Sequence, residues 1–365
     1  MTTLAELIDF IETIAPLSLQ ESYDNAGLIT GDRSQIIAGV LLTLDCTESI
    51  IDEAKANNCN VIIAHHPIIF FGIKKLTGRN YVERTIIKAI KNDIAIYACH
   101  TNLDNIYTGV NAILADKLLL QSPRILRPKK QLLSKLITYI PPAYHQQVVD
   151  SLFAAGAGNI GNYSNCSFNT EGMGSYCPSA DAHPFKGASD SISHEKEIKT
   201  ELIFPNYLEQ AIIKALKESH PYEEISYQII TMQNEWQEVG AGMIGNWSSP
   251  KSGIEALEFI KNKLAVKIIK HTQIIDNQID RVAVCGGSGS FLLNDAINNG
   301  AQIFITSDFK YHEFFNSDGN IMICDIGHYE SEHFTKELLY NVISKKFITF
   351  AVRISNINTN PIHYY

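Results

Sequence analysis

The sequence predicts an α/β fold made of two α/β halves, which are interrupted by a ferredoxin-like α+β insert. Three observations predict it. Strand and helix patterns alternate over the first 130 residues, and they alternate again after Trp236. Between them, the patterns follow the order β-α-β-β-α-β, which is typical of a ferredoxin-like unit. The expected domains are therefore 1–130 and 235–365 for the two halves, and 131–234 for the insert.

The first half begins with an amphipathic helix over residues 4–14. The run Val61-Ile62-Ile63-Ala64 is apolar on both faces, which is typical of a buried parallel sheet. Thr47 is expected to cap the helix at 47–57, which follows the strand expected at 36–44. The strands of this half are expected at 36–44, 60–64 and 95–99, and its further helices at 47–57, 79–92 and 110–120.

The insert contains a glycine-rich stretch over residues 156–187, and we interpret the polar run Lys186 to Lys199 as a surface excursion. We expect the second half to complete one sheet system with the first. The strands of the insert are expected at 136–140, 200–204 and 225–231, and its helices at 145–155 and 207–219. In the second half the strands are expected at 281–285, 302–306, 321–325 and 347–355, and the helices at 251–264, 291–298 and 329–345.

The composition is that of a soluble globular protein. Of 365 residues, 45% are hydrophobic and 19% charged, and the formal net charge is −9. This acidic balance argues against a nucleic-acid binder with a broad basic face. The seven cysteines are scattered without a C-x-x-C pair, which favours reduced thiols in a cytoplasm. We find no signal peptide and no apolar run of membrane-spanning length, so a cytoplasmic protein without a membrane partner is expected.

Residues of metal-ligand type follow several of the predicted strands. His65-His66-Pro67 comes directly after the apolar run at 61–64, and His100 and Asp104 follow the strand at 95–99. In the second half, Asp308 follows one strand, and His328 with Glu332 follows the next. The carboxyl ends of parallel strands meet at one edge of a sheet. Imidazole and carboxylate groups are ligands of zinc, iron and manganese, so the pattern predicts a metal site at this edge.

The adjacent histidines favour two ions rather than one. Side chains of successive strand residues point apart, and Pro67 ends the strand after His66. Two diverging imidazoles fit two ions a few ångströms apart. The alternative is that His65 lies in the core and His66 on the surface, or the reverse.

The other three ligand candidates also have simpler alternatives. His328 and Glu332 are spaced i, i+4, which places both side chains on one helix face, but the pair can equally be a local ion pair. Asp104 can be a metal ligand or a helix N-cap.

A glycine-rich turn, Gly286-Gly287-Ser288-Gly289, joins a predicted strand to a helix. Backbone N–H groups in such a turn can hold a phosphate or another anion. An equally good interpretation is that the glycines are needed for a tight turn.

As a set, these segments resemble the GTP cyclohydrolase I type 2 homologs, also called Nif3-like proteins. The matching segments span nearly the whole chain in the expected order. They are Tyr23-Asp24-Asn25-Ala26-Gly27-Leu28, His65-His66-Pro67, His100-Thr101-Asn102-Leu103-Asp104, Gly286-Gly287-Ser288-Gly289, Ser307-Asp308 with His312, and Gly327-His328 with Glu332.

The resemblance implies a dinuclear site for divalent ions, with zinc, iron or manganese as the first candidates. His66 and Asp104 would hold one ion, His65 and His328 the other, and Glu332 would bridge both. The resemblance also implies a toroidal homohexamer whose sites face an inner cavity. The insert resembles the PII/CutA-like domain of longer family members, in the segments Gly158 to Tyr163 and His220 to Glu224.

The favoured function is a metal-dependent hydrolase acting on a nucleotide or another phosphorylated small molecule, as the family name suggests. His100, Asp308 and His312 are the candidates for proton transfer, because each is expected near the sheet edge. Gly286, Gly287, Ser288 and Gly289 would hold the anion of the substrate. The alternatives are a metal-binding regulatory protein whose insert docks a partner, and a metal carrier.

Overall fold

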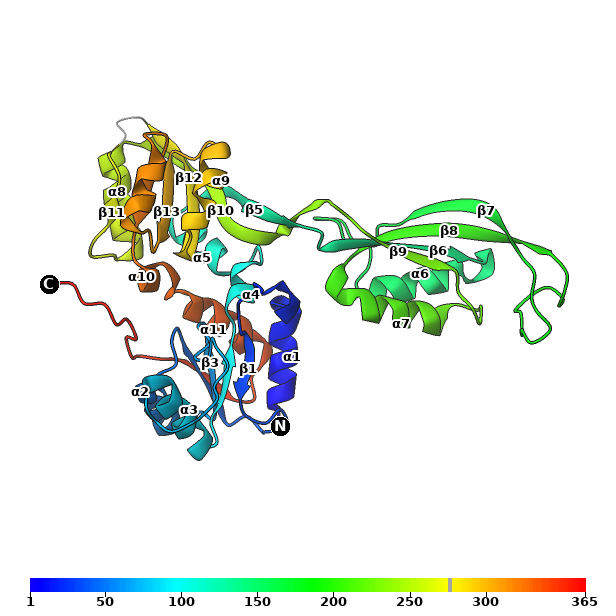
Figure 1. Ribbon diagram of the computed structural model, residues 1–365, viewed down its shortest axis with the longest axis horizontal. Coiled ribbons are helices and arrows are strands. Elements are labelled where there is room, and N and C mark those ends of the chain that lie inside the picture. Colours follow the sequence, from blue (N-terminus) through cyan, green and yellow to red (C-terminus); the bar gives the residue numbers. More distant parts are fainter. Residues whose placement is uncertain (275–277) are drawn as a thin grey trace. The chain divides into compact units, whose positions relative to one another are not determined.

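The computed structural model describes residues 1–274 and 278–365. The chain forms two compact units (Figure 1). The larger unit combines Met1–Pro128 with Gln237–Tyr365, and the smaller consists of Lys129–Trp236. The larger unit contains two separate sheets, and the smaller contains one.

The first sheet of the larger unit has the strand order β1-β4-β3-β2-β15. Strands β4, β3, β2 and β15 run parallel to one another, while β1 is antiparallel to β4. Every residue of β2, β3 and β4 is buried, which explains their apolar sequences. The strands are β1 (Gly27–Thr30), β2 (Gly39–Thr43), β3 (Val61–Ala64), β4 (Ala95–Ala98) and β15 (Ala351–Ile354).

Helices cover both faces of this sheet. On one face, α2 and α3 pack Ile50, Ile51 and Ile86 against Ile62 and Ile96. Figure 1 shows α1 and α11 on the other side. Thr3 begins α1 with a reciprocal hydrogen-bonded capping box to Glu6, and Thr47 is the N-cap residue of α2 although its side chain makes no capping bond. The helices are α1 (Leu4–Ile14), α2 (Glu48–Ala56), α3 (Tyr81–Lys91), α4 (Thr101–Asp104), α5 (Val110–Lys117) and α11 (Thr335–Lys346).

The second sheet has the order β11-β14-β13-β12-β10-β5. Its centre, β12-β13-β14, is parallel, and β10 and β11 pair antiparallel at its two sides. Helices α8 and α5 pack on one face and α9 on the other. The elements are β5 (Gln121–Lys130), β10 (Glu235–Lys251), α8 (Gly253–Leu264), β11 (Lys270–His271), β12 (Ile279–Ser288), α9 (Leu293–Asn298), β13 (Ile303–Ser307), β14 (Met322–Asp325) and α10 (His328–Glu332).

The two halves form two sheets, so the expectation of one sheet system was wrong. Each sheet takes a strand from the other half of the sequence. The C-terminal strand β15 pairs with β2, and β5 lies beside β10. Hydrophobic periodicity identifies strands, but it does not specify the edge that each strand joins.

The smaller unit confirms the ferredoxin-like insert. Its sheet has the order β7-β8-β6-β9 with antiparallel neighbours, and both helices pack on one face through a core that includes Leu136 and Phe204. The elements are β6 (Leu133–Ile140), α6 (His145–Ala154), β7 (Phe168–Tyr176), β8 (Ser193–Pro205), α7 (Glu209–Ser219) and β9 (Tyr227–Thr231). Short 3-10 helices occur at Leu17–Leu19, Pro142–Tyr144, Asn206–Leu208, Ser290–Leu292 and Tyr311–Ser317.

The polar run Lys186 to Lys199 is not a surface excursion along its whole length. Strand β8 begins at Ser193 and pairs with β7 from Ser193 to Glu201. Within β8, His194 and Lys196 are exposed, while Glu195, Glu197 and Lys199 are partly buried.

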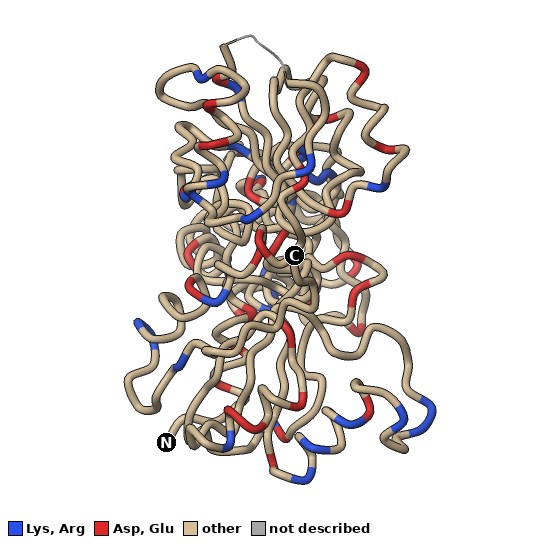
Figure 2. The backbone as a smooth tube through the Cα atoms, turned by 90° about the vertical axis from the view of Figure 1, so that its left-hand side faces the viewer, with Lys and Arg blue, Asp and Glu red and all other residues tan. Residues whose placement is uncertain are grey.

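The helices and the charges of the described residues bear on the expected partners. Within residues 1–274 and 278–365, every helix is too short or too polar to traverse a bilayer. In the view of Figure 2, Lys and Arg are interspersed with Asp and Glu rather than gathered together.

We expect Ile62→Ala to lower the free energy of unfolding by about 2 to 5 kcal/mol, because Ile62 on β3 is fully buried against the helices α2 and α3. Urea unfolding measures the loss. Ile90→Ala on α3 removes the same atoms from a side chain that is 51% exposed, and it should change stability little. Equal losses in both variants would contradict this packing.

Candidate metal centre

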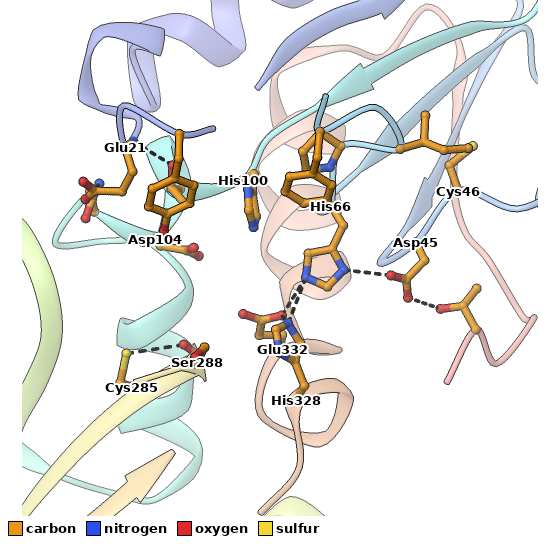
Figure 3. A pocket seen from close by; sticks show the side chains of 18 of the residues that line it. Glu21, Asp45, Cys46, His66, His100, Asp104, Cys285, Ser288, His328 and Glu332 are labelled. Atoms are coloured by element: carbon orange, nitrogen blue, oxygen red, sulfur yellow. Dashed lines mark hydrogen bonds and ion pairs between the residues drawn. The ribbon is translucent and has the colours of Figure 1, made fainter. Parts of the chain in front are cut away.

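Five ligand-type side chains meet at the carboxyl ends of the two parallel sheets, and Figure 3 shows four of them, His66, Asp104, His328 and Glu332. His65 and His66 directly follow β3. Asp104 ends α4, which follows β4, and His328 and Glu332 begin and end α10, which follows β14. Residues from distant parts of the sequence therefore share one site, as the positions at strand ends predicted.

Glu332 lies at the middle of this group. Its Oε2 is 2.9 Å from His66 Nε2 and 3.0 Å from His328 Nε2, and these two nitrogens are 3.2 Å apart. Its Oε1 is 3.7 Å from His65 Nε2, which is 3.6 Å from Asp104 Oδ1. Three sets of potential ligands result, each with donor atoms within 4.8 Å of one another. Two of them share Glu332, namely His65, Asp104 and Glu332, and His66, His328 and Glu332, and the third is His65, His66 and His100.

The two sets around Glu332 pair these residues differently from the resemblance, which joined His66 to Asp104 and His65 to His328, and the assignment of ligands to ions stays a prediction. His65 and His66 belong to different sets around Glu332, but the set with His100 contains both. The partner of each one depends on where α4 and α10 place Asp104 and His328, and this placement is a tertiary property.

Each of the three imidazoles forms a hydrogen bond through Nδ1 on the side away from the centre. His65 Nδ1 donates to the carbonyl oxygen of Cys99 at 2.9 Å. His66 Nδ1 contacts Asp45 Oδ1 at 2.8 Å, and His328 Nδ1 contacts Asp308 Oδ2 at 2.6 Å. Such partners fix the tautomer and the ring orientation of metal-binding histidines and increase their basicity. All three Nε2 atoms are thereby directed to the centre.

Two polar atoms of the centre are buried without a hydrogen-bond partner: His65 Nε2 and Asp104 Oδ1. A buried polar atom without a partner costs about 1 to 3 kcal/mol. A cation between them would satisfy both atoms, so the residues present fit a metal ion.

The pKa values of the two buried carboxyl groups, Glu332 and Asp104, are shifted in opposite directions. Burial works against ionised Glu332, but its contacts with His328, His65 and His66 hold its pKa well below the usual range. Burial and the nearby Glu332 raise the pKa of Asp104 well above its usual value. A divalent cation beside both carboxylates would remove this conflict by favouring their ionised forms.

The histidines facing Glu332 are strongly basic without an ion. Burial opposes the charged form of His66, but hydrogen bonds to Asp45 and Glu332 raise its pKa to about 9. In the same way, Asp308 and Glu332 overcome burial and raise the pKa of His328 to about 11. His65 differs, because its Nδ1 faces the Cys99 carbonyl and not a carboxylate, and burial lowers its pKa.

His100 lies beside the centre, as predicted. Its ring centroid is 5.3 Å from that of His65 and 5.4 Å from that of His66. Its Nδ1 contacts Asp24 Oδ1 at 2.7 Å. Burial opposes ionisation of Asp24, but hydrogen bonds from His100 and Thr101 lower its pKa to about 2. His100 therefore presents Nε2 to the centre and holds a carboxylate behind it.

The other two candidates for proton transfer are placed differently. Asp308 contacts Nδ1 of His328, on the far side of the ring from Glu332. His312 is exposed on the 3-10 helix Tyr311–Ser317, where its ring contacts Tyr311 and Phe315. It is not among the residues that line the pocket around the centre, and its role in proton transfer stays a prediction. The helix begins three residues after Asp308 and carries His312 away.

The glycine-rich turn packs against the centre, and its first two N–H groups are already engaged. Gly286 donates to Asn111 Oδ1 and Gly287 to Ser331 Oγ, both at 2.9 Å. Gly287 has φ +61°, and a Cβ there would clash with Glu332 Oε1. A Cβ on Gly289 would likewise clash with Thr306 Oγ1. The requirement for a tight turn thus accounts for the glycines, and Gly286 and Gly287 have no N–H group left for an anion.

Sequence reasoning missed the residues behind the histidines. Asp45 holds His66 and accepts a hydrogen bond from Thr359, and Asp24 holds His100. Asp45 follows β2 just as His65 follows β3, so the rule about strand ends could have identified it. Asp24 lies in a polar loop without such a signal.

The centre opens into a pocket of about 1260 Å³. Figure 3 shows His66, His100, Asp104, His328 and Glu332 around the same space. Aromatic side chains, Ser288 and Arg127 complete its lining. The volume exceeds the range of about 300 to 1,000 Å³ that is common for small-molecule sites.

We expect Gly287→Ala to destabilise the protein more than Gly319→Ala. Both glycines have positive φ, +61° and +71°, so both variants carry the backbone strain of about 1 to 2 kcal/mol. Only at Gly287 does the new methyl group meet Glu332, while no atom lies within 4 Å of a Cβ at Gly319. Urea unfolding of both variants measures the difference. Equal losses would mean that the turn does not constrain Glu332.

Comparison with known proteins identifies the family of this chain. The Duf34/NIF3 (NGG1p interacting factor 3) family model matches residues 2–361. A protein of Bacillus subtilis named "GTP cyclohydrolase 1 type 2 homolog" is 36% identical over 362 residues, which are 98% of this chain and 97% of that protein. A protein of Staphylococcus epidermidis with the same name is also 36% identical, over 99% of both chains.

A solved structure extends the similarity to the fold. The crystal structure of a Bacillus cereus protein related to NIF3 has a TM-score of 0.88 and 33% sequence identity, and the match covers 100% of this chain and 99% of that one. With matches over almost its entire length, the chain belongs to the Duf34/NIF3 family.

Proposed function

We propose that this protein binds two divalent metal ions and hydrolyses a nucleotide or another phosphorylated small molecule. The set His65, Asp104 and Glu332 would hold one ion, and the set His66, His328 and Glu332 the other, with Glu332 shared. One observation carries the proposal: three imidazoles turn Nε2 towards a single buried glutamate while their Nδ1 atoms are held from outside.

The donor set favours zinc, iron or manganese, because it combines imidazole and carboxylate groups. A thiolate ligand is not expected. Cys285 lines the pocket and burial raises the pKa of its thiol, but its sulfur does not belong to any of the groups of potential ligand atoms. When bound, such ions supply Lewis-acid chemistry, which activates water and neutralises negative charge on the substrate.

His100 is the candidate general acid or base. Its Nδ1 is tied to Asp24, so only Nε2 can exchange a proton with a substrate in the pocket. Asp308 has a positioning role, because it orients His328. The names of the relatives in Bacillus subtilis and Staphylococcus epidermidis support a hydrolytic reaction on a purine nucleotide.

A second candidate is a regulatory metal-binding protein without turnover. The compactness of the insert, residues Lys129–Trp236, favours it, because a separate unit can dock a partner. The toroidal homohexamer and the cytoplasmic location remain predictions. Analytical ultracentrifugation of the full chain tests the hexamer.

Metal content tests the centre. We expect two ions per chain in the purified protein and at most one in His65→Ala, measured by elemental analysis after dialysis. Asp308→Asn should weaken metal binding by about 10- to 100-fold, because His328 loses its orienting carboxylate. His312→Ala is the matched control and should keep both ions, since His312 lies outside the pocket. Unchanged metal content in His65→Ala would refute the assigned centre.

Activity tests the reaction. With both ions bound, the protein should hydrolyse at least one substrate in a panel of GTP, other nucleotides and phosphoesters. His100→Gln should lower kcat by about 10²- to 10⁴-fold while the metal stays bound. Turnover that persists in metal-free Glu332→Gln would contradict the mechanism. A fully loaded protein that hydrolyses no member of the panel would favour the regulatory candidate.

A further inference from the structure

We infer that Arg127 is the anion-binding residue of the pocket and that it selects a nucleotide by its phosphate. This inference rests on the proposed function, because it assigns the substrate class of the same site. Gly286 and Gly287 do not serve this purpose, since their N–H groups already donate to Asn111 and Ser331. Arg127 lines the same pocket and can supply a positive partner for a phosphorylated substrate.

The charges that line the pocket single out Arg127. Among the described residues that line it, Arg127 is the only lysine or arginine. The carboxylate residues of the lining are Glu21, Asp45, Glu48, Asp104 and Glu332. Such a pocket repels a phosphate unless divalent ions offset the carboxylates. With ions at the centre, positive charge is present there and at Arg127, so a ligand with two polar ends fits best.

The guanidinium of Arg127 is held in position, and most of its N–H donors are free to bind a ligand. It lies over the ring of Phe291 at 4.7 Å, and its Nη1 is 3.5 Å from Asp295 Oδ2. That separation is longer than a hydrogen bond, and the arginine side chain is 46% exposed. A guanidinium carries five N–H donors in a fork that matches two oxygens of a phosphate. Most of these donors remain available to a ligand.

Aromatic rings in the same pocket suit the other part of a nucleotide. Phe70, Tyr81 and Phe291 line it, and they are 45%, 58% and 53% exposed. An exposed aromatic face stacks readily with a planar heterocycle. Both Arg127 and Phe291 belong to the second sheet and its helices, because β5 carries the arginine and the 3-10 helix Ser290–Leu292 carries the phenylalanine. The histidines His65, His66 and His100 come from the first sheet, opposite them.

Isothermal titration of the metal-loaded full chain with guanosine 5′-monophosphate, guanosine and inorganic phosphate tests the inference. We expect the monophosphate to bind at least about tenfold more tightly than guanosine, since a charge-assisted hydrogen bond supplies at least about 1.5 kcal/mol. Arg127→Gln should reduce this difference to what the ions alone supply, and Arg127→Lys should reduce it less, because lysine retains the charge without the fork.

Arg124→Gln is the matched control. Arg124 lies three residues earlier on β5, donates to Asn299 Oδ1 at 2.7 Å and does not line the pocket. It should bind the monophosphate as the unmodified chain does. Elemental analysis of each variant separates the two proposals: loss of metal would point to the centre, and loss of phosphate preference with both ions present would point to Arg127.

Three results would overturn the inference. The first is equal affinity of the unmodified chain for the monophosphate and guanosine, and the second is unchanged discrimination in Arg127→Gln. The third is the absence of binding of any of the three compounds to a chain that contains both ions.

Discussion

The site depends on one constraint, the burial of the Glu332 carboxylate among three imidazoles. Glu332 is 3% exposed, and it comes within 3.7 Å of the Nε2 atoms of His65, His66 and His328. A buried carboxylate is costly unless positive groups surround it. The histidines provide such groups in the absence of an ion, and ions would provide them when bound. The Gly286–Gly289 turn allows the close approach, because a side chain at position 287 would occupy the space of Glu332.

The fold serves this constraint by bringing together the carboxyl ends of two separate parallel sheets. The segments that follow the strands of the first sheet carry His65, His66 and Asp104. The helix that follows β14 of the second sheet carries His328 and Glu332. The exchange of β15 and β5 between the halves ties the sheets together, so that a site composed of residues from both has a fixed geometry. The layer of Asp45, Asp308 and the Cys99 carbonyl then orients the rings.

The pocket combines this centre with a second recognition element. Carboxylate residues outnumber cationic ones in its lining, so under our proposal metal loading and anion binding would be coupled, because the carboxylates repel an anion until cations offset them. Arg127 and the aromatic rings lie on the side of the second sheet. A ligand that reaches from the centre to Arg127 would contact both sheets, which makes its affinity sensitive to the arrangement of the two.

The sequence by itself determined the α/β class, the ferredoxin-like insert and the set of residues that meet at the centre, because apolar strands that end in His, Asp or Glu place those side chains at a common edge. Short-range patterns also located most helices and strands. They did not show that the halves form two sheets, since a strand's pattern is the same at either edge. Only the tertiary structure decided that Glu332 lies among His65, His66 and His328, and that His312 is exposed outside the lining of the pocket. It also decided that Asp24 and Asp45 hold His100 and His66, and that Arg127 lines the pocket. These outcomes depend on the relative positions of segments up to hundreds of residues apart, and no local pattern encodes such positions.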